Sequence, residues 1–540
     1  MVITKRGIVA TSQTLASQAG AQVLARGGSA MDAAIAANAV LAVVEPMSDG
    51  IGGDLFAIYR EARTGRLSGI NASGWSPKNL TLSRIKEKGH TVMPSTGILS
   101  VTVPGCVDGW EKLHKRFGRL PWKEVLAPAI YYAENGFPVT EWIAQHWLDT
   151  VGKLKSDEYA RRTFLINDES PKVGHVFRNP DLARALRLLA EAGADAFYKG
   201  EIAKAIVATS RKLDGLLEMG DLRDYDAEWV EPVSTTYRGW KVYELPPNGM
   251  GVAALEMLNI MERFPLANYE PMSADAFHIK MEAQKIAYAD LSRYLGDPRF
   301  SPIPVKTMLS KSYAEQRASG ISMEKATCNP DPGVMMSRAG DTVYLTVVDS
   351  DGNIASLIQS VYLSWGSGVA VEGFGFHLQN RGGLFVLEDG HPNVAGPRKR
   401  PLHTILPAMM EKDGVYIGFG IMGGLNQAQA HAQFVSNVVD HGMNIQAALE
   451  APRFTKLDFG GCNAYIESRV PESVRNDLTR RGHALNVEGA YSSTMGGGQA
   501  VMHNSRTGVN YGASSPRKDG AAVPEPDPYF AAPAAYSRKR

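Results

Sequence analysis

The sequence has 540 residues, and its 57 lysines and arginines against 56 aspartates and glutamates give a formal net charge of +1. Charges of both signs are interspersed, so there is no basic stretch that nucleic acid or an anionic membrane would attract. No segment has the pattern of a signal peptide or a membrane span, and we therefore expect a cytoplasmic protein with neither nucleic-acid nor membrane partners. The cysteines are odd in number and widely spaced, which suggests neither a disulfide framework nor a zinc site: Cys106, Cys328 and Cys462.

Near the N-terminus the sequence predicts a capped helix, a glycine-rich turn and a short strand. Ser29 lies three residues before Asp32 at the head of an alanine-rich run, Ala33 to Val44, which is typical of a buried helix. Residues 55–59 read as a strand. The turn between them is either a tight turn or backbone that lines a catalytic cleft, and it contains Gly50, Gly52 and Gly53.

The middle of the chain, residues 105 to 300, is predicted to be mainly helical. Apolar residues recur at helical spacing, with Gly or Pro near the ends, in residues 107–116, 122–135, 180–192 and 273–294. The last of these helices carries His278 and Glu282 four residues apart. Without a third ligand nearby in sequence, the pair is interpreted as a solvated helix face, and no metal is predicted.

A hairpin follows the helical region. Residues 342–349 alternate between threonine or tyrosine and aliphatic residues, Asp351 to Asn353 turn the chain, and residues 354–362 return as a second strand. The preceding residues 319–340 contain Pro and Gly and read as a mobile loop. A cut between Asp341 and Thr342 would place a free α-amine beside the Thr342 hydroxyl, which combines a nucleophile with a general base. From these residues alone, the favoured interpretation is that Thr342 merely opens a strand.

One motif points to a different chemistry. Gly418 to Gly423 has the form Gly-x-Gly-x-x-Gly between a strand-like segment and a helix-like segment, with Asp440 as a candidate ribose ligand. The surrounding elements do not build the repeated βαβ units of a dinucleotide-binding domain. The match is therefore interpreted as coincidental, and no cofactor is predicted.

Separated motifs over nearly the whole chain resemble the γ-glutamyltranspeptidase family. They are Gly27 to Ala34, Glu45–Pro46, Gly50 to Gly53, Asp341 to Asn353, Gly366 to Gly368, Asn380, Lys399 to Pro401, Pro407, Met422 to Gly424, Ala451 to Phe454 and Tyr511 to Ala513. The resemblance implies an α+β fold, the four-layer αββα sandwich of N-terminal-nucleophile hydrolases. It also implies self-cleavage into a large subunit, residues 1–341, and a small subunit, residues 342–540. These subunits would stay together as one structural domain, with a dimer of heterodimers as a further expectation.

The resemblance assigns the catalytic roles. Thr342 is expected to be the nucleophile, Ser360 a second hydroxyl that orients it, and the backbone N–H groups of Gly423 and Gly424 the donors to the tetrahedral oxyanion. Residues without a Cβ let amide donors approach a negative charge closely, and one such donor can contribute roughly 3–4 kcal/mol to lowering the barrier.

The substrate pocket departs from the glutamyl-specific members. The family's carboxylate-binding arginine is missing near Leu82, and the aspartate that pairs with the substrate ammonium is replaced by Leu384. A buried ammonium without its carboxylate would be costly, which argues against a glutamyl substrate. We expect the substrate to be bound by residues that replace other family positions: Arg381, Tyr362, His403 and Thr404. Arg381 is equally open to interpretation as a structural arginine.

These departures favour a small amide that carries a carboxylate and no ammonium. The prediction is hydrolysis of oxamate to oxalate and ammonia, as in the branch of the family that includes a cytoplasmic oxamate amidohydrolase of purine catabolism. Three alternatives stay open: a γ-glutamyl hydrolase or transferase with a rebuilt pocket, a cephalosporin-type acylase, and an unprocessed scaffold without activity. The tail from Pro524 to Arg540, rich in Pro and Ala, is expected to be disordered.

Overall fold

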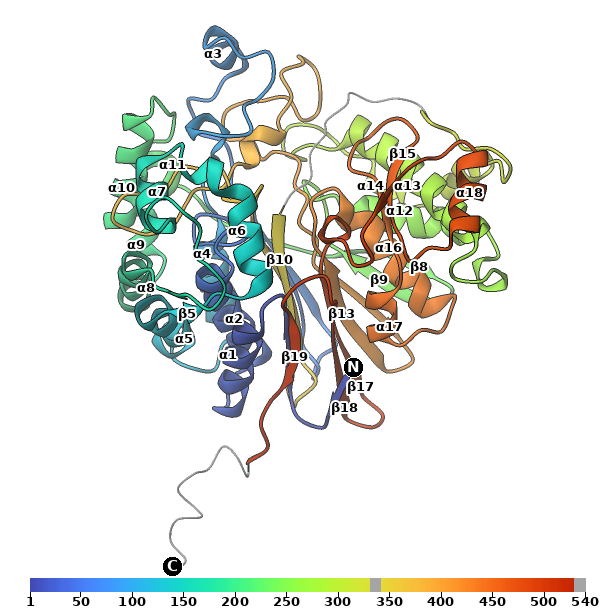
Figure 1. The fold of residues 1–540 in the computed structure, drawn as a ribbon, viewed down its shortest axis with the longest axis horizontal. Coiled ribbons are helices and arrows are strands. Elements are labelled where there is room, and N and C mark those ends of the chain that lie inside the picture. The colour runs from blue at the N-terminus through green and yellow to red at the C-terminus, as the bar shows by residue number, and fades with distance from the viewer. Residues whose placement is uncertain (331–340, 529–540) are drawn as a thin grey trace, which may run out of the picture.

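Two antiparallel seven-stranded sheets lie face to face, and helices cover the outer face of each (Figure 1). The computed structural model describes residues 1–330 and 341–528. The first sheet has the order β19 (Ala521–Pro524), β2 (Ile8–Thr11), β10 (Asp341–Val348), β11 (Ile354–Tyr362), β3 (Asp54–Arg60), β4 (Leu67–Ala72) and β7 (Glu228–Val230). The second has the order β1 (Val2–Thr4), β18 (Val509–Ser514), β17 (Gly498–Asn504), β13 (Val415–Ile421), β12 (Ala408–Lys412), β9 (Trp240–Glu244) and β8 (Val233–Tyr237). This arrangement confirms the predicted αββα sandwich.

The helices form two outer layers, and the chain builds most of one layer before the other. Beside the first sheet lie α1 (Thr14–Ala25), α2 (Ala30–Val44), α4 (Cys106–Phe117), α5 (Trp122–Asn135), α6 (Glu141–Leu154), α7 (Glu158–Phe164), α8 (Pro180–Ala192), α9 (Asp195–Tyr198), α10 (Glu201–Lys212) and α11 (Met219–Arg223). Beside the second sheet lie α12 (Gly251–Met261), α13 (Ala274–Tyr294), α14 (Val305–Met308), α15 (Lys311–Ala318), α16 (Asn426–Val439), α17 (Ile445–Glu450) and α18 (Glu472–Arg480). The predicted helices are confirmed.

Shorter elements connect these layers. They are α3 (Leu82–Glu87), the hairpin of β5 (Phe137–Pro138) and β6 (Val176–Phe177), the small sheet of β14 (Phe454–Thr455), β15 (Asn463–Glu467) and β16 (Ala484–Glu488), and the 3₁₀ turns Ile98–Ser100, Leu266–Asn268, Arg381–Leu384 and Ser493–Met495. Among the described residues, no helix combines the length and the apolar character needed to cross a bilayer.

Side-chain alternation along β10 separates two parts of the core. Val343, Leu345 and Val347 belong to the core shared with the α1 and α2 layer, whereas Tyr344 and Val348 pack between the two sheets. Successive strand residues point to opposite faces, so Thr342 shares the inter-sheet face with Tyr344. The predicted hairpin therefore delivers Thr342 to one end of the space between the sheets.

Helix α2 holds this hairpin from outside. The Ser29 side chain accepts from the Asp32 N–H, and the Asp32 carboxylate accepts from the Ser29 N–H, so the predicted N-terminus is a capping box. Every residue of the helix is buried, and its many alanines let it pack closely on β10 and β11. The position of the hairpin therefore depends on a helix with almost no polar face.

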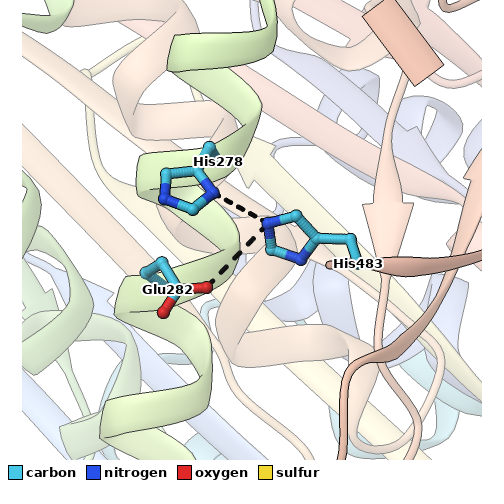
Figure 2. A group of neighbouring side chains, drawn as sticks. All are labelled: His278, Glu282 and His483. Atoms are coloured by element: carbon cyan, nitrogen blue, oxygen red, sulfur yellow. Dashed lines mark hydrogen bonds and ion pairs between the residues drawn. The ribbon is translucent and has the colours of Figure 1, made fainter. Parts of the chain in front are cut away.

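Two expectations about the cysteines and the histidine pair were wrong. Cys328 and Cys462 form a disulfide with a Cα–Cα distance of 4.6 Å, although 134 residues separate them. His278 and Glu282 are not a solvated face, since α18 and the segment after it bury them and bring His483 to within hydrogen-bond distance of His278 (Figure 2). Sequence spacing could not reveal either pairing, because both join distant segments.

The predicted loop and tail are described only in part. Residues 331–340 and 529–540 lie outside the described residues, so the expectations for those stretches stay predictions. The start of the expected tail is ordered, since Pro524 ends β19 and Glu525 is buried. Its carboxylate accepts from the Gly7 N–H at 2.9 Å.

Candidate active site

The hydroxyl groups of Thr342 and Ser360 meet across the β10–β11 hairpin. Thr342 Oγ1 donates to Ser360 Oγ at 3.2 Å, and the Tyr362 N–H donates to the same oxygen at 2.7 Å. The strand register shifts between Asp341 and Val343, so Thr342 faces an irregular part of β11. Such irregularities re-aim side chains and often lie beside active sites. Both hydroxyl-bearing side chains are buried, and their catalytic roles stay predictions.

A lysine that the sequence analysis did not single out contacts the same strand end. Lys518 Nζ lies 3.2 Å from the Thr342 carbonyl oxygen and forms an ion pair with Glu45. The Glu45 carboxylate also accepts from Ser12 Oγ at 2.6 Å. Because Lys518 and Glu45 are both buried, their charges compensate each other beside the candidate nucleophile. No local pattern in the sequence marked Lys518, which lies five residues after the Tyr511 to Ala513 motif.

The two glycines proposed as oxyanion donors form the turn from β13 into α16. Gly423 has φ 115° and Gly424 has φ 59°, a region that favours glycine. Gly423 lines a cavity of about 590 Å³ together with Lys518, Trp142 and Ser364. Lys518 connects this cavity with the strand end, since its Nζ contacts the Thr342 carbonyl oxygen. The role of the Gly423 and Gly424 N–H groups as oxyanion donors stays a prediction.

An aspartate that was missed by the sequence analysis lies on the neighbouring strand. Asp54 begins β3 and is paired across to Ser360. Its Oδ1 accepts from the N–H groups of Gly74 and Gly105, both at 3.1 Å. Complete burial raises the pKa of Asp54 to about 7, an effect that the positive charge of Arg381 and these N–H groups partly offset. The signal was a carboxylate at the head of an apolar strand, directly after the glycine turn.

His403 contacts this aspartate. Its Nε2 lies 3.0 Å from Asp54 Oδ2, and burial together with the charge of Arg381 lowers the pKa of His403 well below its ordinary value. The ring is therefore neutral. The Ile405 N–H points at Nδ1 from 3.4 Å, which leaves the ring proton on Nε2, where it is donated to Asp54 Oδ2. His403 is thus a support for Asp54 rather than a general base.

Arg381 is fully buried, and only part of its guanidinium is bonded. Nη1 donates to Thr404 Oγ1 at 2.7 Å, and the guanidinium lies 4.8 Å from the centre of the Tyr362 ring. Nε and Nη2 have no hydrogen-bond partner among the described residues. Burial lowers the pKa of Arg381 to about 10, and the nearby Asp54 opposes that shift, so the group is charged at neutral pH.

Tyr362 joins this cluster to the candidate nucleophile, Thr342. It has a positive φ of 80°, which is rare for a residue with a bulky side chain. Its N–H binds Ser360 Oγ, while its ring lies against Arg381. The four residues predicted to bind the substrate therefore form one buried group, with Arg381 between Thr404 and Tyr362, and with His403 attached through Asp54.

The glycine-rich fingerprint serves a different purpose. Gly420 packs against the Tyr344 ring, where a Cβ would lie 2.5 Å from the ring atoms, so glycine lets the two sheets approach. Asp440 accepts from Tyr237 Oη at 2.6 Å and from Ser436 Oγ at 2.7 Å. Its carboxylate therefore joins β8 to α16 through hydrogen bonds.

The comparison with known families decides the relationship. Residues 16–525 match the family model described as Gamma-glutamyltranspeptidase. The chain belongs to this family. A Bacillus subtilis protein named glutathione hydrolase-like YwrD proenzyme is 38% identical over 529 residues, which cover 97% of this chain and 99% of that protein.

Two further relatives carry different activities in their names. The oxamate amidohydrolase proenzyme of Klebsiella pneumoniae is 32% identical and covers 96% of this chain and 99% of its own length. The crystal structure of cephalosporin acylase from Bacillus halodurans superposes with a TM-score of 0.91 at 42% identity, covering 97% of this chain and 96% of that one. This chain is thus a hydrolase-family member with the N-terminal-nucleophile fold, and its relatives span several substrates.

Proposed function

We propose that this chain is a self-processing amidohydrolase that uses Thr342 as an N-terminal nucleophile. The proposed substrate is a small amide with a carboxylate, and oxamate, giving oxalate and ammonia, is the best candidate. The observation that carries the proposal is the buried Arg381 beside the hairpin, with Nε and Nη2 unbonded among the described residues. Those two N–H groups form the edge of a guanidinium that binds a carboxylate through two parallel hydrogen bonds.

The first step of the proposal is self-cleavage. The Thr342 hydroxyl attacks the Asp341 carbonyl carbon, the peptide C–N bond breaks, and an ester forms with the Thr342 oxygen. Water then hydrolyses that ester, which leaves a carboxylate on Asp341 and a free α-amine on Thr342. The large subunit, residues 1–341, and the small subunit, residues 342–540, result. The word proenzyme in the names of the relatives supports this step.

In the second step the same hydroxyl attacks the substrate amide. The α-amine of Thr342 accepts the hydroxyl proton, and the N–H groups of Gly423 and Gly424 stabilise the oxyanion. The tetrahedral intermediate collapses as the protonated amine gives its proton to the leaving nitrogen, and ammonia departs. Water then attacks the acyl ester, releases the acid and restores Thr342. Ser360 positions the attacking oxygen throughout.

Charge compensation favours a carboxylate over an ammonium group in the Arg381 subsite. Arg381, Tyr362 and Thr404 present a cation, a ring and a hydroxyl, and Leu384 stands where a carboxylate would be needed for an α-ammonium. Among the residues that the structure describes, Asp54 is the acidic side chain that acts electrostatically on Arg381, and its raised pKa reduces its negative charge near neutral pH. The subsite therefore carries net positive charge.

A second candidate is a cephalosporin-type acylase. It is supported by the cavity of about 590 Å³ that Gly423 and Lys518 share, which exceeds what oxamate needs, and by the similarity to the Bacillus halodurans acylase. A γ-glutamyl hydrolase or transferase is the third candidate, on the strength of the glutathione hydrolase-like relative. An unprocessed scaffold stays the least favoured prediction.

One experiment separates these functions. Purified protein is incubated with oxamate, glutamine, glutathione, a γ-glutamyl anilide and an acylated cephalosporin nucleus, and ammonia or amine release is measured for the wild type and Thr342→Ala. Release from oxamate alone supports the leading proposal. Release from a γ-glutamyl or cephalosporin substrate in preference to oxamate would replace it with the matching alternative.

N-terminal sequencing of the same preparation tests the nucleophile. The mature wild type is expected to yield Thr-Val-Tyr-Leu from a second polypeptide, and Thr342→Ala is expected to stay a single chain. Full activity in an uncut protein would overturn the assignment of Thr342. The cytoplasmic location, the purine-catabolic role and the dimer of heterodimers stay predictions that this experiment does not address.

A further inference from the structure

The segment just before the proposed cut is fastened to residues that follow it. The Ala326 N–H donates to the Arg481 carbonyl at 2.7 Å, and Arg481 Nη1 donates to the Met323 carbonyl at 2.9 Å. The Gly461 N–H donates to Asn329 Oδ1 at 2.9 Å. These bonds run between residues 323–329 of the proposed large subunit and residues 461–481 of the proposed small subunit. They hold the two parts together near the end of the large subunit.

A buried cluster lies beneath this segment (Figure 2). His278 Nδ1 and His483 Nε2 lie 2.8 Å apart, and His278 Nε2 donates to the Ser322 carbonyl at 2.7 Å. Since Nε2 carries the proton, His278 Nδ1 accepts from His483, which joins the two proposed subunits. The Glu282 carboxylate accepts from the Thr327 N–H at 3.1 Å.

The same cluster has a set of donors that a metal ion could use, but each is engaged by protein. Lys285 Nζ lies 2.5 Å from Glu282 Oε1, and the two imidazoles bind each other. A metal would have to displace an ammonium group and separate the rings. The contacts therefore favour a hydrogen-bonded clamp. In this clamp, His278 and Glu282 of α13 bind the backbone of the Ser322 to Thr327 segment.

The disulfide lies at the edge of this clamp. Cys328 follows the clamped segment directly, and Lys285 Nζ lies 3.8 Å from Cys462 Sγ. Cys328 is exposed and Cys462 is half-buried, so a reductant in solution can reach the bond. Cys328 precedes the proposed cut by 13 residues, whereas Cys462 follows it.

We propose that the Cys328–Cys462 disulfide covalently joins the large and small subunits of the mature protein. This inference rests on the proposed self-cleavage between Asp341 and Thr342. In the uncut chain the bond closes a loop, but after the cut it becomes the one covalent link between the described parts of the two polypeptides. The hydrogen bonds of the clamp hold the two cysteines in place, so the link forms before the cut and survives it.

The link makes the covalent state of the mature protein depend on its redox environment. Disulfides persist in oxidising compartments and are uncommon where thiol reductants are abundant. The disulfide thus argues against the cytoplasmic location expected from the sequence. In a reducing environment the subunits would be held by packing and hydrogen bonds alone.

The test uses the whole protein, produced in an oxidising compartment and alkylated before denaturation so that thiols cannot exchange. On a denaturing gel the wild type is expected to run as one band without reductant and as two bands with it. Two bands without reductant would overturn the inference while leaving the self-cleavage intact. One band under both conditions would contradict the self-cleavage, and the inter-subunit link with it.

Variants identify the cysteines. Cys328→Ser and Cys462→Ser are each expected to give two bands without reductant, whereas Cys106→Ala, which changes the buried free cysteine, is expected to keep one. Mass spectrometry of an unreduced digest is expected to yield a single linked peptide pair that contains Cys328 and Cys462. A linked pair that includes Cys106, or the absence of any linked pair, would contradict the proposal whatever the gel shows.

Discussion

The Tyr362 N–H and the Thr342 hydroxyl donate to one oxygen, Ser360 Oγ, at 2.7 Å and 3.2 Å. The two donors belong to different parts of the site, because Thr342 is the candidate nucleophile and Tyr362 lies against the Arg381 guanidinium. A single serine therefore fixes the distance between the reacting oxygen and the group proposed to bind the substrate carboxylate. That geometry leads to specific expectations.

Ser360→Ala should lower kcat by about tenfold, the equivalent of one lost hydrogen bond of about 1.4 kcal/mol. KM should change less, since the substrate-binding groups remain. Steady-state kinetics on the processed variant measures both. The matched control is Ser356→Ala, which removes a buried hydroxyl from the same strand that contacts Tyr344 Oη rather than Thr342. An equal loss of kcat in the two variants would mean that Ser360 affects catalysis only through the stability of the fold.

Arg381→Lys should keep the positive charge but lose the edge formed by Nε and Nη2. A hydrogen bond to a charged group contributes about 1.5–3 kcal/mol, so KM for a carboxylate-bearing amide should rise by roughly 10- to 100-fold. Competition assays with oxalate as an inhibitor should show a parallel rise in its inhibition constant. A neutral amide of the same size should be affected little. A comparable loss on the neutral amide would refute a carboxylate role for Arg381.

The raised pKa of Asp54, about 7, should appear in substrate binding. Below this pH Asp54 is neutral and Arg381 attracts a carboxylate, whereas above it the ionised Asp54 competes for the same cation. KM for a carboxylate-bearing amide should therefore rise as pH increases through about 7. Asp54→Asn should flatten that rise. A KM that is independent of pH from 5 to 9 in the wild type would contradict the electrostatic coupling of these two residues.

Asp54 should also make folding stability depend on pH. Its pKa is 3.8 for the ordinary group and about 7 in the folded protein, so between these values the folded state holds a proton that the unfolded state has released. Stability contributed by this group is present in full below pH 3.8 and is lost as pH rises through about 7. Chemical denaturation of the wild type and Asp54→Asn should show the variant gaining relative stability across that window.

Lys518→Met should slow self-cleavage and lower kcat, because Lys518 Nζ holds the Thr342 carbonyl at 3.2 Å. It also leaves Glu45 buried without its cation, which is costly. The double variant Lys518→Met with Glu45→Gln removes that unpaired charge and should regain stability but not kcat. Time courses of cleavage on a gel and thermal melts separate the two effects. Restored kcat in the double variant would show that Lys518 only neutralises Glu45.

Lys123→Met, which replaces an exposed lysine of α5, serves as a control for the loss of a lysine. It should leave cleavage, kcat and the melting temperature close to those of the wild type. A loss of kcat or cleavage rate as large as that of Lys518→Met would indicate a general effect of removing a positive charge.

Local pattern by itself determined the elements that carry the site. The alternation in residues 342–349 predicted β10, and Ser29 with Asp32 predicted the start of α2, because side-chain periodicity and capping depend on neighbours in sequence. The order of motifs likewise indicated the family, and hence Thr342 and the four pocket residues. Periodicity and capping are properties that a short stretch of chain expresses without the rest of the fold, and the motif order can be read along the chain without any contact between the motifs.

Tertiary structure alone decided which distant groups meet. Asp54 reaches Ser360 only because β3 pairs with β11, and its pKa is raised only because the fold removes it from water. Cys328 meets Cys462, and His278 meets His483, because the small sheet and α18 pack over α13. Burial and long-range pairing depend on the whole chain at once, so no local pattern in the sequence records them.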